Sequence, residues 1–148
     1  MTVIAYRDGI LATDSGAWYG DAFLGYGDKI AILPDASLLA TSGTWSDGAI
    51  AREWFSGNQL GERPRMEDSF GGLLVRPGGL VLQLGSKLVP FEIRGPFHAD
   101  GSGHEIALGA MHMGATAIQA VEAACEWGAR CRGPVQWHRV QSCVKEAA

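Results

Sequence analysis

Cysteines are few in this chain of 148 residues, and none of the three belongs to a CxxC pair. They are Cys125, Cys131 and Cys143. An odd number without such pairs excludes a disulfide framework and a cysteine zinc site, and it indicates a reducing compartment such as the cytoplasm. Cys125 falls within a helical pattern, where a cysteine usually packs as a small apolar side chain. We therefore expect a cytoplasmic protein with no metal and no cofactor.

Long apolar runs and an excess of one charge are also missing. No stretch approaches the roughly 18 apolar residues of a membrane span, and no basic segment followed by an apolar one marks a signal peptide. The formal net charge is −4, and no run of Lys and Arg indicates a nucleic-acid surface. Because 47% of the residues are apolar, the chain can build a core, and we expect one domain over residues 1–148.

Short strands and a few helices are expected along the chain. The pattern predicts strands at 3–6, 10–13, 22–24, 29–33, 37–41, 72–76, 80–84, 87–93 and 135–140. Helices are expected at 46–55, with Thr44 or Ser46 as the N-cap, and at 105–113 and 115–129. Residues 59–68 and 98–104 are predicted to be loops. Because strands and helices are segregated along the chain, this order favours a layered α+β domain over a βαβ repeat.

A small residue, Thr2, follows Met1. Removal of Met1 would leave Thr2 with a hydroxyl nucleophile and a free α-amine, whose ordinary pKa of about 7.7 to 8.0 is close to neutral. Such an amine can take the hydroxyl proton as a general base without any histidine. The apolar segment 3–6 would hold this terminus in a strand. By itself a threonine at position 2 carries no such meaning, so the hypothesis depends on its neighbours.

Two charged residues could act on Thr2. Asp14 follows the second predicted strand, and Lys29 opens a later one. A lysine beside a nucleophile stabilises developing negative charge, and an aspartate can orient that lysine. Each residue also has an ordinary interpretation, Asp14 as a turn cap and Lys29 as an exposed strand end.

The ordered set of these segments resembles the opening of proteasome β-type subunits, and in particular HslV-like peptidases and their short phage-borne or orphan relatives. The matching segments are 2–5, 9–14, 29–30 and 39–43, together with the Gly-Ser-Gly loop at 101–103. The resemblance implies an N-terminal-nucleophile (Ntn) hydrolase of the α+β class. Its fold would be a four-layer αββα sandwich with a shortened first helical layer, because the polar segment 59–68 replaces a second helix.

The resemblance also implies roles for individual residues. Thr2 would be the nucleophile and its amine the base, Lys29 would tune the site while held by Asp14, and Ser102 would assist proton transfer near the amine. The reaction would be amide hydrolysis through an acyl-enzyme ester on Thr2.

An oxyanion site is implied in the segment 39–43, where Ala40 is the aligned residue and Gly43 ends the turn. A backbone N–H there would bind the oxyanion, and this donor does not depend on a side chain. Peptides or unfolded proteins would be the substrates. The expected assembly is a homo-oligomeric ring, which an ATPase unfoldase could serve. Trp18 and its aromatic neighbours would favour apolar substrate residues.

Departures from the family pattern leave two alternatives open. The segment 127–133 lacks the acid that usually follows the last helix, and Cys131 stands where a serine is usual. A catalytically inactive proteasome-like protein with a structural or assembly role is therefore one alternative, and a small-molecule amidase of the same fold is another. His98, Asp100, His104 and Glu105 match no metal motif and are expected to be capping and solvent-facing groups.

Overall fold

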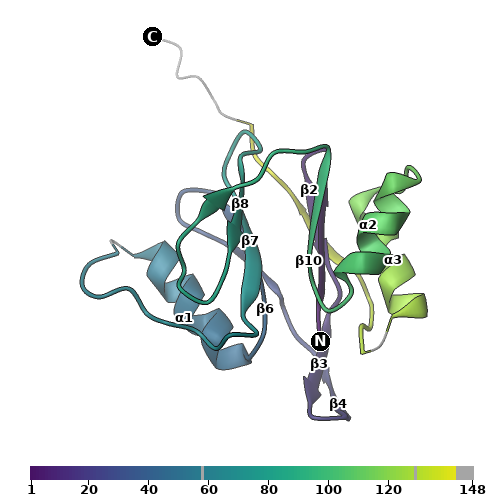
Figure 1. Cartoon of the computed structure of the whole chain (residues 1–148), viewed down its shortest axis with the longest axis horizontal. Helices are drawn as coiled ribbons and strands as arrows, with labels where there is room; N and C mark the ends of the chain where they lie inside the picture. The colour runs from purple at the N-terminus through teal and green to yellow at the C-terminus, as the bar shows by residue number, and fades with distance from the viewer. Residues whose placement is uncertain (58, 129, 143–148) are drawn as a thin grey trace.

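The computed structural model describes residues 1–57, 59–128 and 130–142, which form an α+β fold. Helix α1, a five-stranded sheet, a four-stranded sheet and the pair α2 and α3 follow one another as layers across the molecule (Figure 1). Both sheets are antiparallel. The predicted α+β class is therefore confirmed. Cys143 lies outside the described residues, as does the last residue of the helix expected at 115–129.

The four-stranded sheet carries the N-terminus. Its strand order is β10 (Phe97–Gly101), β1 (Val3–Arg7), β2 (Ile10–Thr13) and β11 (Gln136–Arg139). The hairpin between β1 and β2 turns at Asp8 and Gly9, whose φ angles of 50° and 81° are the left-handed values that a tight two-residue turn requires. Because β1 lies between two partners, the chain next to Thr2 is ordered from the first residues.

The second sheet lies between α1 and the first sheet. Its strand order is β5 (Ile30–Ile32), β6 (Leu38–Ser42), β7 (Gly71–Val75), β8 (Val81–Leu84) and β9 (Phe91–Glu92). Helix α1 (Trp45–Ser56) begins directly after β6, and the Thr44 hydroxyl caps it by accepting a hydrogen bond from the Asp47 N–H. Thr44 is therefore the N-cap, and the predicted helix is confirmed.

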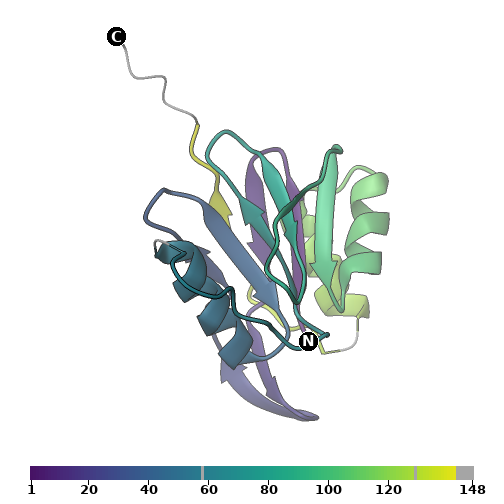
Figure 2. The same cartoon turned by 60° about the vertical axis from the view of Figure 1, so that its left-hand side comes forward.

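A two-stranded hairpin and a helical pair complete the fold. The hairpin, β3 (Gly16–Tyr19) and β4 (Ala22–Tyr26), extends away from the layers near the N-terminus (Figure 2). Helices α2 (His104–His112) and α3 (Ala117–Trp127) pack on each other and on β1. Within the described ranges, no helix is long and apolar enough to cross a bilayer.

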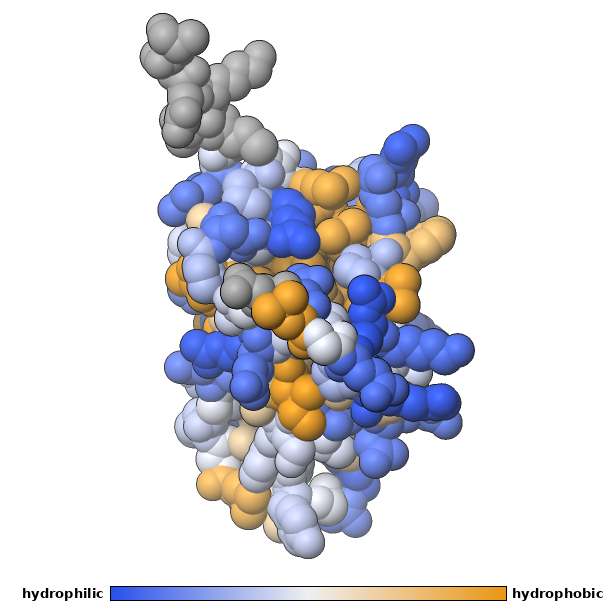
Figure 3. Space-filling model, turned by 90° about the vertical axis from the view of Figure 1, so that its left-hand side faces the viewer, coloured by the Kyte–Doolittle hydropathy of each residue, from blue (hydrophilic) through white to orange (hydrophobic). Residues whose placement is uncertain are grey.

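The core divides into three apolar clusters that match the layers. Successive side chains of β1 point to opposite faces, so Val3 packs towards α2 and α3 while Ile4 packs between the sheets. Phe55 of α1 packs on the outer face of the second sheet with Leu74. The face that carries α1 shows apolar side chains in separate groups between hydrophilic ones (Figure 3).

Two predicted elements differ from the structure, and one observed strand was not predicted. The expected loop 98–104 contains most of β10, and β3 has no counterpart in the prediction. The segment 87–93 forms only the short β9. Strand β10 alternates apolar Phe97 and Ala99 with polar His98 and Asp100, but the pattern is short and runs directly into a Gly-Ser-Gly turn. Its pairing with β1 over all five residues adds to this weak local preference for a strand.

Candidate active site

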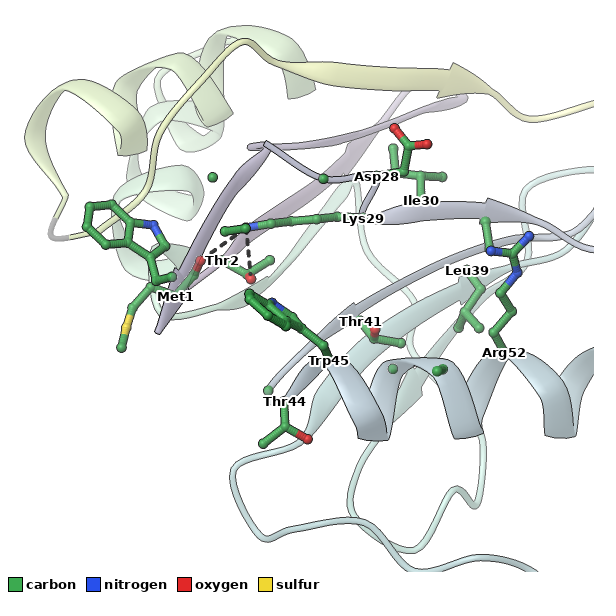
Figure 4. A pocket seen from close by; sticks show the side chains of 18 of the residues that line it. Met1, Thr2, Asp28, Lys29, Ile30, Leu39, Thr41, Thr44, Trp45 and Arg52 are labelled. Carbon is green, nitrogen blue, oxygen red and sulfur yellow. Dashed lines mark hydrogen bonds between the residues drawn. The ribbon is translucent and has the colours of Figure 1, made fainter. Parts of the chain in front are cut away.

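Thr2 directly precedes β1, and its side chain is turned towards a lysine (Figure 4). The Lys29 Nζ is 3.2 Å from the Thr2 Oγ1 and 3.1 Å from the carbonyl oxygen of Met1. Thr2 is 6% exposed although it is next to the chain terminus, because β2 and β10 flank the strand that follows it. The hydroxyl therefore has a cation beside it in a largely enclosed place.

Asp14 holds Lys29 from a fully buried position. Lys29 Nζ lies 3.0 Å from one Asp14 carboxylate oxygen and 3.1 Å from the other. The same carboxylate accepts hydrogen bonds from the backbone N–H groups of Val3 at 3.1 Å and Arg132 at 3.2 Å. A buried carboxylate is stable only when a cation and hydrogen-bond donors compensate its charge in this way. These three donor groups, through four hydrogen bonds, fix the carboxylate, and the carboxylate fixes the lysine.

Ser102 meets the backbone of Thr2. The Thr2 N–H donates to the Ser102 Oγ, and this hydroxyl donates to the Thr2 carbonyl, each at 3.2 Å. Gly101 has a φ of +87°, and a Cβ there would collide with the Thr2 carbonyl. A Cβ at Gly103 would lie 2.8 Å from that of Val3. Both glycines are needed for the loop to come this close to β1.

The segment after α3 takes part in the site through its backbone. Besides its N–H bond to Asp14, Arg132 accepts hydrogen bonds at its carbonyl from Ser15 and Gly16 at 2.9 and 3.0 Å. The Arg132 guanidinium lies 4.1 Å from the ring centre of Phe23. Sequence reasoning missed Arg132, because a backbone donor leaves no signal in the residue type. This segment has no carboxylate facing Ser102, yet it still contacts Asp14.

Cys131 is buried beside Ser102. Burial raises the pKa of the Cys131 thiol, while a hydrogen bond with Ser102 acts in the opposite direction. Burial also raises the pKa of the Cys125 thiol to about 12. Because the thiolate is the nucleophilic form, neither thiol has the environment of a catalytic cysteine.

A cavity of about 680 Å³ opens next to Thr2 and runs along α1. The Trp45 side chain points from the start of α1 towards Thr2 and Lys29 (Figure 4). Other apolar walls come from Trp18, Ile30, Ala31, Leu39 and Ala49, while Asp28, Arg52 and Glu53 bring charge. Trp45 is 59% exposed, so a large aromatic surface faces this opening without a protein partner. In the sequence, only the position of Trp45 directly after the predicted N-cap Thr44 could have indicated that this side chain lies at the opening of the cavity.

Ala40 and Gly43, the two residues expected at the oxyanion site, lie in different surroundings. Ala40 belongs to β6 and is buried between the sheets, whereas its neighbours Leu39 and Thr41 face the cavity. Gly43 also lines the cavity, in the turn between β6 and α1, with a φ of +120°. The expected turn at 39–43 is thus strand up to Ser42, and the structure does not bring the Ala40 side chain to the site.

The two histidines expected to face solvent or act as caps have other partners. His98 is buried and its ring lies 6.1 Å from the ring of Tyr6, and burial lowers the pKa of His98. His104 Nδ1 lies 2.7 Å from the Gly101 carbonyl oxygen. Among the described residues, no group of three His, Cys, Asp or Glu side chains could hold a metal ion.

No family model matches the sequence, and no curated protein matches it either. Among solved structures, the chain is similar to one named Thiobacillus denitrificans BPH, with a TM-score of 0.68. The match covers 95% of this chain and 97% of that one, at 21% sequence identity. The likeness therefore extends over nearly the whole of both chains, and it establishes a shared fold.

Proposed function

We propose that this protein is an N-terminal threonine hydrolase that cleaves peptide bonds, with the αββα sandwich of proteasome-like Ntn hydrolases as its fold. The observation that carries the proposal is the connected set at the start of β1. Lys29 touches the Thr2 hydroxyl at 3.2 Å and Asp14 at 3.0 Å, while Ser102 lies 3.2 Å from the Thr2 nitrogen. The order of helix, sheet, sheet and helices supports the fold assignment.

Cleavage of the Met1–Thr2 bond would turn the Thr2 amide nitrogen into a free amine beside Ser102. Burial, and after it the charge of Lys29, lowers the pKa of the Met1 α-amine. Burial and the charge of Lys29 would likewise lower the pKa of a free Thr2 amine, which lies closer to Lys29. A lowered pKa increases the fraction of the amine that is unprotonated at neutral pH, which is the form that can accept the proton of the Thr2 hydroxyl.

The reaction then proceeds in two steps. Thr2 Oγ1 bonds to the substrate carbonyl carbon as its proton passes to the amine, and the carbonyl electrons move onto oxygen. The intermediate collapses, the C–N bond breaks, and the leaving amine takes that proton. Water attacks the resulting ester in the same way and restores Thr2. Lys29 stabilises negative charge on Oγ1, and a backbone N–H near Gly43 would bind the oxyanion.

The walls of the cavity support a preference for substrates with a large apolar side chain. Trp18 and Trp45 both line the cavity that opens at Thr2, and the Trp45 side chain points towards Thr2 (Figure 4). Such surface stabilises an apolar side chain by removing it from water. The proposed setting is the cytoplasm, which suits the free Cys125 and Cys131. We further propose a homo-oligomeric ring, served by an ATPase unfoldase.

The test compares two forms of the protein on a fluorogenic peptide with an aromatic residue before the scissile bond. One form begins at Thr2, and the other has its Thr2 amine blocked by acetylation. We expect hydrolysis by the free form alone, with Thr2→Ala inactive and Thr2→Ser active. Equal hydrolysis by the free and acetylated forms, or none by either, would contradict the proposal.

A further inference from the structure

A polar pair lies between the two sheets, behind the turn that carries Ser102. Asp100 is in β10 of the first sheet, and Gln83 is in β8 of the second. The Gln83 Nε2 donates to Asp100 Oδ2 at 2.5 Å, and the Gly101 N–H donates to Asp100 Oδ1 at 2.6 Å. A Cβ at Gly71 would lie 2.9 Å from the same carboxylate, so glycine in β7 leaves the space that Asp100 occupies.

Within the part of the chain that the structure describes, Asp100 forms no ion pair. Its two oxygens are instead satisfied by one side-chain amide and one backbone N–H, both at the short distances of charge-assisted hydrogen bonds. Apolar packing would fill the inter-sheet space at lower cost. The pair is therefore better explained by the geometry that it imposes than by its contribution to stability.

That geometry concerns the turn at Gly101 and Ser102. Ser102 is itself exposed, and its hydroxyl is held by the Thr2 backbone and by Cys131. Its place at the Thr2 nitrogen therefore depends on the backbone before and after it. Asp100 holds the Gly101 N–H from one side, and His104 Nδ1 contacts the Gly101 carbonyl from the other at 2.7 Å. The left-handed φ of +87° at Gly101 is thus fixed at both ends of the residue.

We infer that Asp100, held by Gln83, is a positioning residue that keeps the Ser102 hydroxyl at the nitrogen of Thr2. The pair links the second sheet directly to the turn beside the candidate nucleophile. Its effect on catalysis rests on the proposed function, whereas its effect on the turn does not.

The experiment therefore has two readouts, and it compares Asp100→Asn with Asp100→Leu. Asn keeps an oxygen for the Gly101 N–H and can still bond Gln83 once that amide turns over, whereas Leu keeps neither. The first readout is the amide proton shift of Gly101 by NMR, which a short bond to a carboxylate moves downfield. The second is the rate at which a peptide epoxyketone labels Thr2 in protein that begins at Thr2.

We expect Asp100→Leu to lose the downfield shift and to label roughly a hundredfold more slowly, as a misplacement of about 1 Å at a reacting centre can do. Asp100→Asn should stay within about threefold of the parent rate, because a positioning role needs only the hydrogen bonds. Asp35→Leu is the matched control, since Asp35 also binds a backbone N–H, that of Ser37, in the turn at the opposite end of β5 from Lys29.

An Asp100→Leu protein with the parent shift and labelling rate would overturn the inference. If that variant does not fold, Gln83→Met tests the same pair while leaving the bond from Gly101 to Asp100. A smaller change of the Gly101 shift is then expected, and no change would overturn the inference. A parent protein that is never labelled would count against the proposed function alone, because the NMR readout still reports on the turn.

Discussion

The ammonium of Lys29 lies 3.0 Å from the carboxylate of Asp14, which is fully buried. The lysine side chain is 13% exposed. A pair so enclosed behaves differently from a surface ion pair, because removing one partner leaves a charge away from water.

Lys29→Met should therefore destabilise the fold by about 3–5 kcal/mol, the usual effect of leaving a buried charge without its partner. Denaturant unfolding followed by fluorescence measures it. The double variant Lys29→Met with Asp14→Asn should recover part of the loss. Arg94→Met is the control, because Arg94 pairs with Glu92 at an exposed site, and such pairs contribute at most about 1 kcal/mol. A loss below that value for Lys29→Met would contradict this description of the site.

Trp45 should decide which substrates are cleaved. Trp45→Ala removes the aromatic side chain that points towards Thr2, so hydrolysis of a peptide with a large apolar residue before the scissile bond should fall about tenfold in kcat/KM. A peptide with alanine there should lose much less. Trp137→Ala is the matched control, since this tryptophan is similarly exposed, on β11. Equal losses for both peptides would contradict a role in specificity.

His98 should make stability depend on pH. Burial lowers the pKa of His98 in the folded protein, so between its ordinary value of about 6.5 and the folded value the unfolded chain binds more protons. The free energy of unfolding is thus full above about pH 6.5 and falls as the pH is lowered towards the folded pKa. His98→Gln should flatten this part of the curve. Thermal unfolding of both proteins from pH 8 to 5 measures it, and parallel curves would contradict the prediction.

Arg7 should stabilise the end of α2. Its Nη1 donates to the carbonyl of Met111 at 2.6 Å, in the last turn of the helix, and to that of Ala115 at 3.2 Å, in the segment that follows the helix. Arg7→Met should reduce the free energy of unfolding by about 1.5–3 kcal/mol, the usual range for hydrogen bonds to a charged donor. Arg7→Lys should restore part of it. No loss in urea unfolding of Arg7→Met would show that water replaces the guanidinium at these carbonyls.

Elements that are marked by a turn or capping residue in their own segment could be predicted from the sequence. The Asp8-Gly9 turn fixes the first hairpin, and Thr44 caps α1 where expected. The structure brings together Thr2, Asp14, Lys29 and Ser102, the four side chains that the family resemblance implies for one site.

Elements that depend on distant partners do not follow from the sequence. Strand β10 exists because β1 pairs with it, and Asp100 gains its partner from a different sheet. Ala40 was expected to offer its backbone N–H to an oxyanion, and in the structure it lies within β6, paired with Ile30 on one side and Leu73 on the other. The alignment of a short strand can shift by one or more residues, and no local signal near Ala40 fixes that register.

The proposed function depends on the Thr2 hydroxyl acting as nucleophile with its own amine as the base. Intact-mass measurement of the purified protein, before and after treatment with a peptide epoxyketone, shows whether the two groups act together. We expect a chain that begins at Thr2 and gains the mass of one inhibitor, with no adduct on Thr2→Ala. A chain that keeps Met1 and gains no adduct would contradict it, and would favour a protein of this fold without catalytic activity.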